Sequence, residues 1–220
     1  IMDFNDTSKE AEFRQRVREF LDQNAEKRVN SKQAEVSSAG APETVQGGAE
    51  AAKIALDNAK EWQKKKAEAG FAAILWPKEF GGYGGTPIEQ VIYQQEEHNY
   101  FVHSGYFEIG IGMLGPTMMV WGKDEDKKRY LPKMITGEEI WCQLFSEPSA
   151  GSDLAGIRMK AEKDGDEWVL NGQKVWTSGA HFADYGMVVA RSDPSALKHK
   201  GLTYFFLDMK TPGVEAKPIK

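Results

Sequence analysis

Two short segments of the chain carry side chains that could do chemistry. The first, Gln143–Ser152 (QLFSEPSAGS), offers three serine hydroxyls and backbone donors left open by glycine. Donors arranged in this way can cradle a planar heterocycle or an anion. The second, Lys174–Gly179 (KVWTSG), places an indole beside two hydroxyls at a predicted strand end. Each also has a plainer interpretation, because serine-rich loops commonly follow strands and Trp176 alone is more typical of a core residue.

Three carboxylates are candidates for a general base. Glu96 and Glu97 are adjacent on a polar helical stretch, a pattern typical of a solvated face. Glu147 precedes a proline in a turn and is more typical of a structural residue than of a base. We therefore assign no catalytic residue within these 220 residues.

No metal site is predicted. His98 and His103 are five residues apart, off the i, i+4 spacing that places two ligands on one helical face, and Cys142 is the only cysteine. The basic run Lys198–Lys200 has two interpretations: it contacts phosphate groups of a ligand, or it is a solvated loop.

The elements that must position these segments divide into a helical half and a β half. In the helical half, Thr7 with Glu10 and Thr86 with Glu89 are capping boxes, in which each side chain satisfies the other residue's backbone N–H. Further helices are predicted over Glu50–Ala69, Ser104–Trp121 and Asp124–Lys133, with a flexible loop over residues 26–50. The expected inward positions are Phe13, Val17, Phe20 and Leu21, then Ile54, Ala55, Ala59 and Trp62, then Ile88, Val91 and Ile92.

The pattern changes near residue 140, where short apolar runs of strand length begin. The strands are predicted at Trp141–Phe145, Met159–Glu162, Glu167–Leu170, Tyr185–Ala190 and Leu202–Leu207, with an Asp164-Gly165 hairpin turn. The expected domains are residues 1–137 and 138–220. The second has few strands and apolar edges, so we expect it to be incomplete and the native protein to be about twice as long.

Composition narrows the function class. The 40% hydrophobic and 28% charged content is typical of a globular protein, and the net charge of −5 disfavours nucleic acids and anionic membranes as partners. No apolar run approaches the ~20 residues that span a bilayer. A single cysteine suits a reducing compartment, so a cytoplasmic location is expected.

Taken together, the motifs resemble the acyl-CoA dehydrogenase family. CQLFSEPSAGSDLAG, LNGQKVWTSGAHFAD and VVARSD match its pattern in order and spacing, and WPKEFGGYGG and GKDEDKKRYLPKMITGEEIWC match upstream. The resemblance runs from about residue 50 to the end. It implies an α+β fold: an amino-terminal all-α domain, then a mainly antiparallel β domain, with a carboxy-terminal helical domain outside these residues.

The resemblance also implies a cofactor and its contacts. FAD would lie between the β domain and the last helical domain. The implied cofactor-binding residues are Gln143, Leu144, Phe145, Ser146, Gly151, Ser152, Trp176, Thr177 and Ser178, and Ser152 would also approach the pantetheine part of the substrate.

The implied activity is that of an oxidoreductase of lipid metabolism, as in fatty acid β-oxidation: αβ-dehydrogenation of an acyl-CoA, with hydride to flavin N5. Electrons would pass to a separate electron-accepting flavoprotein. The base, usually a Glu, would lie beyond residue 220, so these residues alone are expected to be inactive. A homo-oligomer, dimer or tetramer, is expected. The alternatives are a non-catalytic flavin-binding partner subunit, or an acyl-CoA oxidase or monooxygenase relative.

Overall fold

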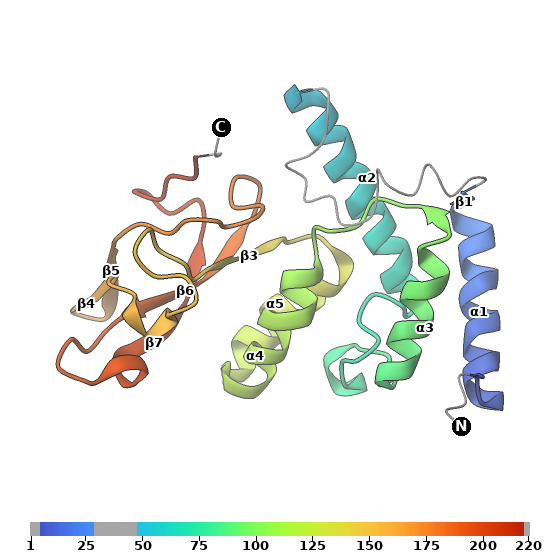
Figure 1. Ribbon diagram of the computed structural model, residues 1–220, viewed down its shortest axis with the longest axis horizontal. Helices are drawn as coiled ribbons and strands as arrows, with labels where there is room; N and C mark the ends of the chain where they lie inside the picture. Colours follow the sequence, from blue (N-terminus) through green and yellow to red (C-terminus); the bar gives the residue numbers. More distant parts are fainter. Residues whose placement is uncertain (1–4, 29–47, 218–220) are drawn as a thin grey trace. The chain divides into compact units, whose positions relative to one another are not determined.

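The computed structural model describes residues 5–28 and 48–217, and the chain divides into two compact units, Ile1–Glu138 and Glu139–Lys220. Helices fill the first unit and the main sheet lies in the second, which confirms the α+β class (Figure 1). Among the described residues, none of the helices combines the length and apolar character needed to cross a bilayer.

The described part of the helical unit contains five α-helices, of which α1 packs on α3 and α2 packs on α5 (Figure 1). Their bounds are α1 Ser8–Asn24, α2 Gly48–Glu68, α3 Pro87–Glu97, α4 Gly115–Trp121 and α5 Asp124–Thr136. A π-helical turn, Gly110–Leu114, runs directly into α4, so the helix predicted over Ser104–Trp121 changes its hydrogen-bonding pattern at Gly115 without a break. Two short strands, β1 Glu26–Lys27 and β2 Tyr100–Phe101, pair antiparallel.

Both predicted capping boxes begin their helices. The Thr7 N–H donates to Glu10 Oε2 at 2.7 Å, and the Thr86 N–H donates to Glu89 Oε2 at 2.7 Å. Each threonine hydroxyl accepts the reciprocal N–H bond. Pro87 at the start of α3 adds a fixed φ suited to a first helical turn.

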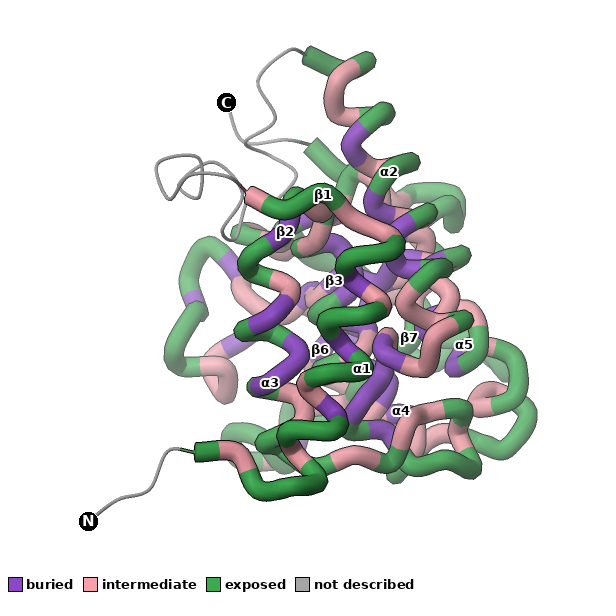
Figure 2. Tube along the Cα trace, turned by 90° about the vertical axis from the view of Figure 1, so that its right-hand side faces the viewer, coloured by how far each residue is buried: buried purple, intermediate pink, exposed green. Residues whose placement is uncertain are grey.

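The core of the helical unit lies where α1, α2 and α3 meet, and the burial pattern along these helices can be followed in Figure 2. It comprises Phe13, Val17, Leu21, Trp62, Phe71, Ile74, Ile92, Tyr93 and Tyr100. Three predicted inward positions are wrong: Ile54, Ile88 and Val91 are each about half exposed. Ile54 and Val91 lie one residue, and so about 100° of helical rotation, from the buried Ala55 and Ile92.

The loop predicted over residues 26–50 is wrong at both of its ends. Glu26–Lys27 forms β1, and Gly48–Glu50 begins α2, so both ends belong to regular elements. Residues 29–47 lie outside the described part of the chain. The strand β1 exists because β2 supplies a partner from residue 100, which local sequence does not reveal.

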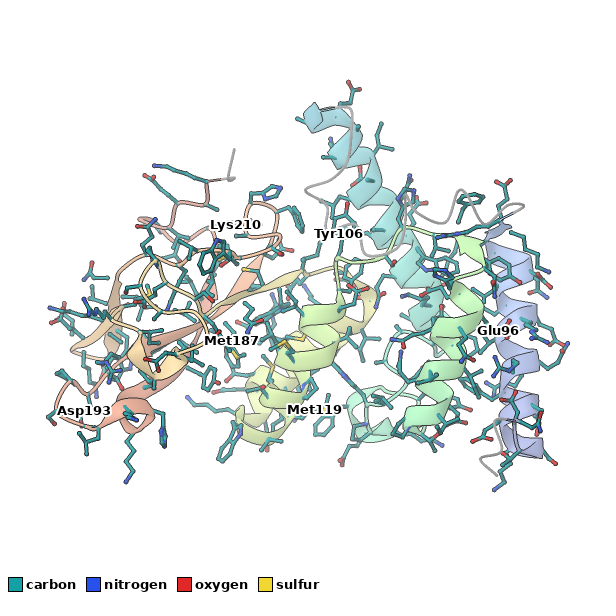
Figure 3. The ribbon with its side chains drawn as sticks, in the orientation of Figure 1. Glu96, Tyr106, Met119, Met187, Asp193 and Lys210 are labelled. Carbon is teal, nitrogen blue, oxygen red and sulfur yellow. The ribbon has the colours of Figure 1, made fainter. Side chains whose placement is uncertain are left out.

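The predicted solvated face at Glu96 and Glu97 is also wrong. Glu96 is buried on the side of α3 that faces α1 (Figure 3), where it accepts from Arg14 Nη1 at 2.8 Å and Arg18 Nε at 2.9 Å. Glu97 accepts from Trp62 Nε1 at 2.8 Å. A buried carboxylate requires such donors, and the two arginines of α1 supply them on the face of α3 that also buries Ile92 and Tyr93.

The β unit is one mixed sheet centred on β6 (Figure 1). Its strands are β3 Trp141–Leu144, β4 Lys160–Asp164, β5 Glu167–Asn171, β6 Tyr185–Arg191 and β7 Leu202–Asp208. β7 pairs antiparallel along the whole of β6, and β4 pairs antiparallel with β5. β3 and the first residue of β4 pair parallel with β6, and these ladders are shorter. The predicted mainly antiparallel sheet is therefore present.

The arrangement around β6 positions the first candidate segment. Because β7 occupies one edge of β6 throughout, β3 and β4 must share the other edge, β3 at Tyr185–Val188 and β4 at Arg191. The chain between them, residues 145–159, has no place in the ladder and leaves the sheet as a loop.

Replacing Glu96 with Gln should lower the free energy of unfolding by about 1–3 kcal/mol, because it weakens the hydrogen bonds to two arginines in a buried setting. Burial raises the pKa of Glu96, but bonds from Arg18 and Arg14 outweigh it and leave the pKa below its ordinary value. The stabilisation is thus complete above the unfolded pKa of about 4.3 and is lost as the pH falls through the lower folded pKa.

Urea unfolding at pH 7 and at a series of acidic pH values measures this difference, with Glu12→Gln on the exposed side of α1 as control. The gap between wild type and Glu96→Gln should close in acid. A gap that stays the same at every pH tested would contradict the ion-pair interpretation.

Candidate active site

Two segments of the β unit meet although no strand pairing joins them. They are the loop of residues 145–159, which follows β3, and residues 172–179, which follow β5. The Val175 N–H donates to the Ser146 carbonyl at 2.9 Å. Lys174 Nζ donates to the Phe145 carbonyl at 2.9 Å and contacts Glu147 Oε1 at 2.9 Å. The structure therefore brings together the two segments that the sequence singled out.

A tight turn shapes the serine-rich part of the loop. Glu147 and Ala150 exchange backbone hydrogen bonds of 2.8 and 3.0 Å, which reverses the chain and leaves Ser149, Gly151 and Ser152 exposed. The hydroxyls and backbone groups around the turn are accessible to a ligand, as a cradle requires.

Trp176 adopts a backbone conformation that is unfavourable for its side chain. Its φ is +54°, in the left-handed region that costs an L-residue roughly 1–2 kcal/mol, and its side chain is 70% exposed. The ring extends over the first segment, since a Cβ added to Gly151 would lie 3.5 Å from Trp176 Cζ3. Trp176 is therefore not a core residue, and its indole is accessible to a ligand.

Thr177 supplies a polar atom that the described chain leaves without a partner. Its Oγ1 is inaccessible to water and has no hydrogen-bond partner among the described residues. Buried hydroxyls in folded proteins are nearly always bonded, so this oxygen is suited to a ligand group. Ser178 follows it and is exposed. The prediction that Lys174–Gly179 lies at a strand end is wrong, because Val175 bonds a loop carbonyl and Trp176 has a positive φ.

The remaining predicted cofactor-binding residues lie on β3 and just after it, and they differ in how accessible their side chains are to a ligand. Leu144 is buried, and its side chain fills the space over Gly186, so its backbone alone can face a ligand. Gln143 is half-buried. Phe145 is half-buried and its ring lies 5.7 Å from the Tyr204 ring. Their hydrogen-bonding with a ligand stays a prediction.

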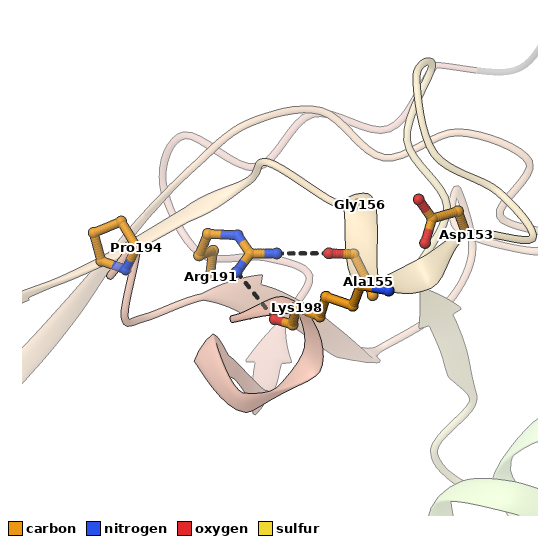
Figure 4. A pocket seen from close by; sticks show the side chains of 6 residues that line it. All are labelled: Asp153, Ala155, Gly156, Arg191, Pro194 and Lys198. Carbon is orange, nitrogen blue, oxygen red and sulfur yellow. Dashed lines mark hydrogen bonds between the residues drawn. The ribbon is translucent and has the colours of Figure 1, made fainter. Parts of the chain in front are cut away.

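A cavity of about 360 Å³ opens at the far end of the same loop, lined by Asp153, Ala155, Gly156, Arg191, Pro194 and Lys198. Arg191 donates to the carbonyls of Ala155 at 2.7 Å and Lys198 at 3.2 Å (Figure 4). Since this guanidinium is engaged by backbone, Lys198 is the lining cation left to meet an anion, and Asp153 adds a carboxylate that would repel one. Both interpretations of the basic run at Lys198–Lys200 therefore stay open.

Lys174, as the partner of Glu147, is a residue of this region that the sequence did not reveal. Both side chains are nearly inaccessible, with exposures of 6% and 5%. They are 27 residues apart and belong to different segments, so no local pattern pairs them. The one sequence feature that indicates a buried partner for Lys174 is its place as the single charged residue in a segment that includes Val175 and Trp176.

Replacing Trp176 with Gly should leave the free energy of unfolding within about 0.5 kcal/mol of wild type, because relief of the positive φ offsets the entropy of glycine. The matched control is Trp168→Gly on β5, whose side chain is about half exposed but packs edge-on against Phe205. It should lose about 1–2 kcal/mol. Denaturant unfolding of both variants measures the contrast, and equal losses would mean that Trp176 is a packing residue.

The chain is similar to known proteins over most of its length. Residues 7–138 match the family model of the acyl-CoA dehydrogenase N-terminal domain, and residues 142–220 match that of the acyl-CoA dehydrogenase middle domain. Among curated proteins, the acyl-CoA dehydrogenases IpdE1 and FadE34 of Mycobacterium tuberculosis are 39% and 44% identical over 75% and 77% of this chain. The chain spans 43% and 24% of their respective lengths.

Solved structures give the same result. The Tcur3481-Tcur3483 steroid ACAD is similar with a TM-score of 0.74 and 30% identity, over 96% of this chain and 50% of that one. The ChsE4-ChsE5 complex from M. tuberculosis has a TM-score of 0.72 and 29% identity, over 95% of this chain and 49% of that one. With both domain models matched along nearly its whole length, the chain belongs to the acyl-CoA dehydrogenase family, which is a family of FAD-dependent flavoprotein oxidoreductases.

Proposed function

We propose that this chain forms the β-domain side of the flavin site in an enzyme that dehydrogenates an acyl-CoA thioester between its α and β carbons. The observation that carries the proposal is the meeting of Gly151 with the Trp176 ring, with the Thr177 Oγ1 that the described residues leave unpartnered next in sequence. The exposed face of the indole offers a flat ligand a stacking surface, the absence of a side chain at Gly151 lets the loop approach the ring, and the unpartnered hydroxyl would bond the ligand's polar edge.

The residues present fit FAD. Gln143–Ser146 and Trp176–Ser178 would contact the ring system, and Gly151 and Ser152 would contact the diphosphate and ribityl region. Bound FAD supplies the hydride acceptor. Hydroxyl and N–H donors of the chain would stabilise negative charge on the ring, and the Trp176 indole would exclude water from one side. Ser152, exposed beyond the turn, would also approach the pantetheine arm of the substrate.

The general base is proposed to lie outside residues 1–220. Glu147 is buried and accepts bonds from Lys174 and from the N–H groups of Arg158 and Met159, at 2.7 to 2.9 Å, so its oxygens are occupied. Glu96 is held by two arginines, and Glu97 accepts bonds from Trp62 and Tyr93. A base must be within reach of the proton that it removes, whereas each of these carboxylates is engaged by partners within its own unit.

FAD affinity tests the site directly. The full-length protein should purify yellow, and Trp176→Ala with Ser178→Ala in it should weaken FAD binding more than tenfold, because stacking and a hydrogen bond to the ring are each worth about 1–3 kcal/mol. The control is Trp168→Ala, which removes an indole from β5 and should leave affinity unchanged. Fluorescence titration with FAD measures both, and unchanged affinity in the double variant would remove these residues from the site.

Residues 1–220 alone should not dehydrogenate an acyl-CoA, even in excess FAD. Without a positioned base the rate falls by about 10²–10⁴, and an open flavin face admits water that weakens its electrostatics. Anaerobic titration with straight-chain, branched and steroid acyl-CoAs follows flavin absorbance, with a full-length relative such as IpdE1 as positive control. Loss of flavin absorbance when an acyl-CoA is added to residues 1–220 would mean that these residues contain a general base.

Electrons are proposed to pass to a separate electron-accepting flavoprotein, and the protein is proposed to be a homo-oligomer. One alternative is an oxidase, because the prolyl acyl carrier protein oxidase AnaB has a similar structure, with a TM-score of 0.70 and 27% identity. The other is a non-catalytic subunit, because the ChsE4-ChsE5 structure is a complex of two named chains. Rapid reoxidation of reduced flavin by O₂ would favour the oxidase, and inactivity of the full-length protein with bound FAD would favour the subunit.

A further inference from the structure

The two segments proposed to face the flavin are held together by few bonds, and these are concentrated at one point. Two consecutive residues, Lys174 and Val175, bond three consecutive residues, Phe145 to Glu147. Among the described residues, no strand pairing joins the two segments. Their relative position therefore depends on the side chains of Lys174 and Glu147 and on one backbone bond.

Glu147 also connects this point to the end of the loop. Its Oε2 accepts the Arg158 N–H at 2.7 Å, and its Oε1 accepts the Met159 N–H at 2.8 Å and contacts Lys174 Nζ. Arg158 and Met159 are the last residues before β4. One carboxylate thus closes the loop of residues 145–159 at its base and ties it to the segment that carries Trp176.

The charge state of the pair fits this arrangement. Burial raises the pKa of Glu147, but the Arg158 N–H, Lys174 and the Met159 N–H outweigh it and leave the pKa below its ordinary value. Burial lowers the pKa of Lys174, and its bond to Glu147 offsets this only in part. The two groups bond each other directly, at 2.9 Å.

A contribution to the free energy of unfolding does not by itself explain why a buried ion pair lies at this position. A buried ion pair gives little net stabilisation compared with a neutral pair of the same volume, because desolvation offsets the attraction. Strain lies immediately beside it, since Trp176, one residue after Val175, has a φ of +54°. A strained residue persists only where its surroundings fix it.

We infer that Glu147 and Lys174 are positioning residues for the flavin site, which set the height of the Trp176 ring over Gly151 and so set FAD affinity. This inference rests on the proposed function. It assigns neither residue a contact with flavin or substrate. The pair affects FAD affinity by fixing the position of the Trp176 ring, and this effect is separate from its effect on the stability of the β unit.

Three variants separate the two effects: Glu147→Gln, Lys174→Met and the double variant with both changes. Each single variant leaves the other member of the pair as a buried charge without a partner. Each should therefore have a lower free energy of unfolding and bind FAD at least tenfold more weakly. The double variant removes both charges and should recover the part of the stability that each single variant loses through an unpaired buried charge. It should not recover FAD affinity, because Met cannot bond the Phe145 carbonyl and Gln cannot replace the carboxylate contacts.

A matched control is Glu96→Gln, which breaks another buried ion pair, within the helical unit. It should lose stability without changing FAD affinity. Amide hydrogen exchange gives a readout that needs no FAD: protection should fall at Val175, Arg158 and Met159 in the double variant while the β6–β7 ladder keeps its protection. That pattern also shows that the variant is folded.

The outcomes distinguish this inference from the proposed function. If the wild-type protein binds no FAD, the proposed function is wrong and the inference fails with it. If the wild type binds FAD and the double variant recovers affinity together with stability, the pair is structural only and the inference alone is overturned. Unchanged exchange at Val175 in Lys174→Met would overturn it as well.

Discussion

The strand β6 imposes the constraint on which the rest of the β unit depends. A strand has two hydrogen-bonding edges, and β7 fills one of them from Tyr185 to Arg191. β3 and β4 are left to share the other, so the chain between them is forced out of the sheet. Its polar backbone must then be satisfied without a ladder, because an unpaired buried peptide group costs about 1–3 kcal/mol.

Glu147 meets part of that need. One carboxylate satisfies two backbone N–H groups at the end of the loop and a lysine that bonds the carbonyl at its beginning. The serine and glycine residues beyond the turn are thereby presented on a fixed frame. The same lysine is two residues before the strained Trp176. The Glu147–Lys174 pair therefore holds both the serine-rich loop and the segment that carries Trp176.

The helical unit uses a buried carboxylate in a related way. Glu96 on α3 accepts hydrogen bonds from two arginines of α1, and Glu97 accepts hydrogen bonds from both Trp62 and Tyr93. Aromatic packing of Phe13, Phe71 and Tyr93 supplies the apolar contact. In both units, apolar surface brings the elements together and a buried carboxylate determines which faces meet, since a misplaced charge there would be left without partners.

The sequence by itself determined the class of the fold, both capping boxes, the two segments of the candidate site, and the β4–β5 hairpin, although its turn is Gly165-Asp166, one residue later than the predicted Asp164-Gly165. These are local features: a cap needs residues three apart, and a hairpin needs a dipeptide that tolerates a positive φ. Tertiary structure alone decided that Val91 faces outward while Glu96 is buried, that β1 finds β2, and that Lys174 reaches Glu147. Each of these depends on a partner distant in sequence, whose charge or free edge becomes available only when the chain is folded.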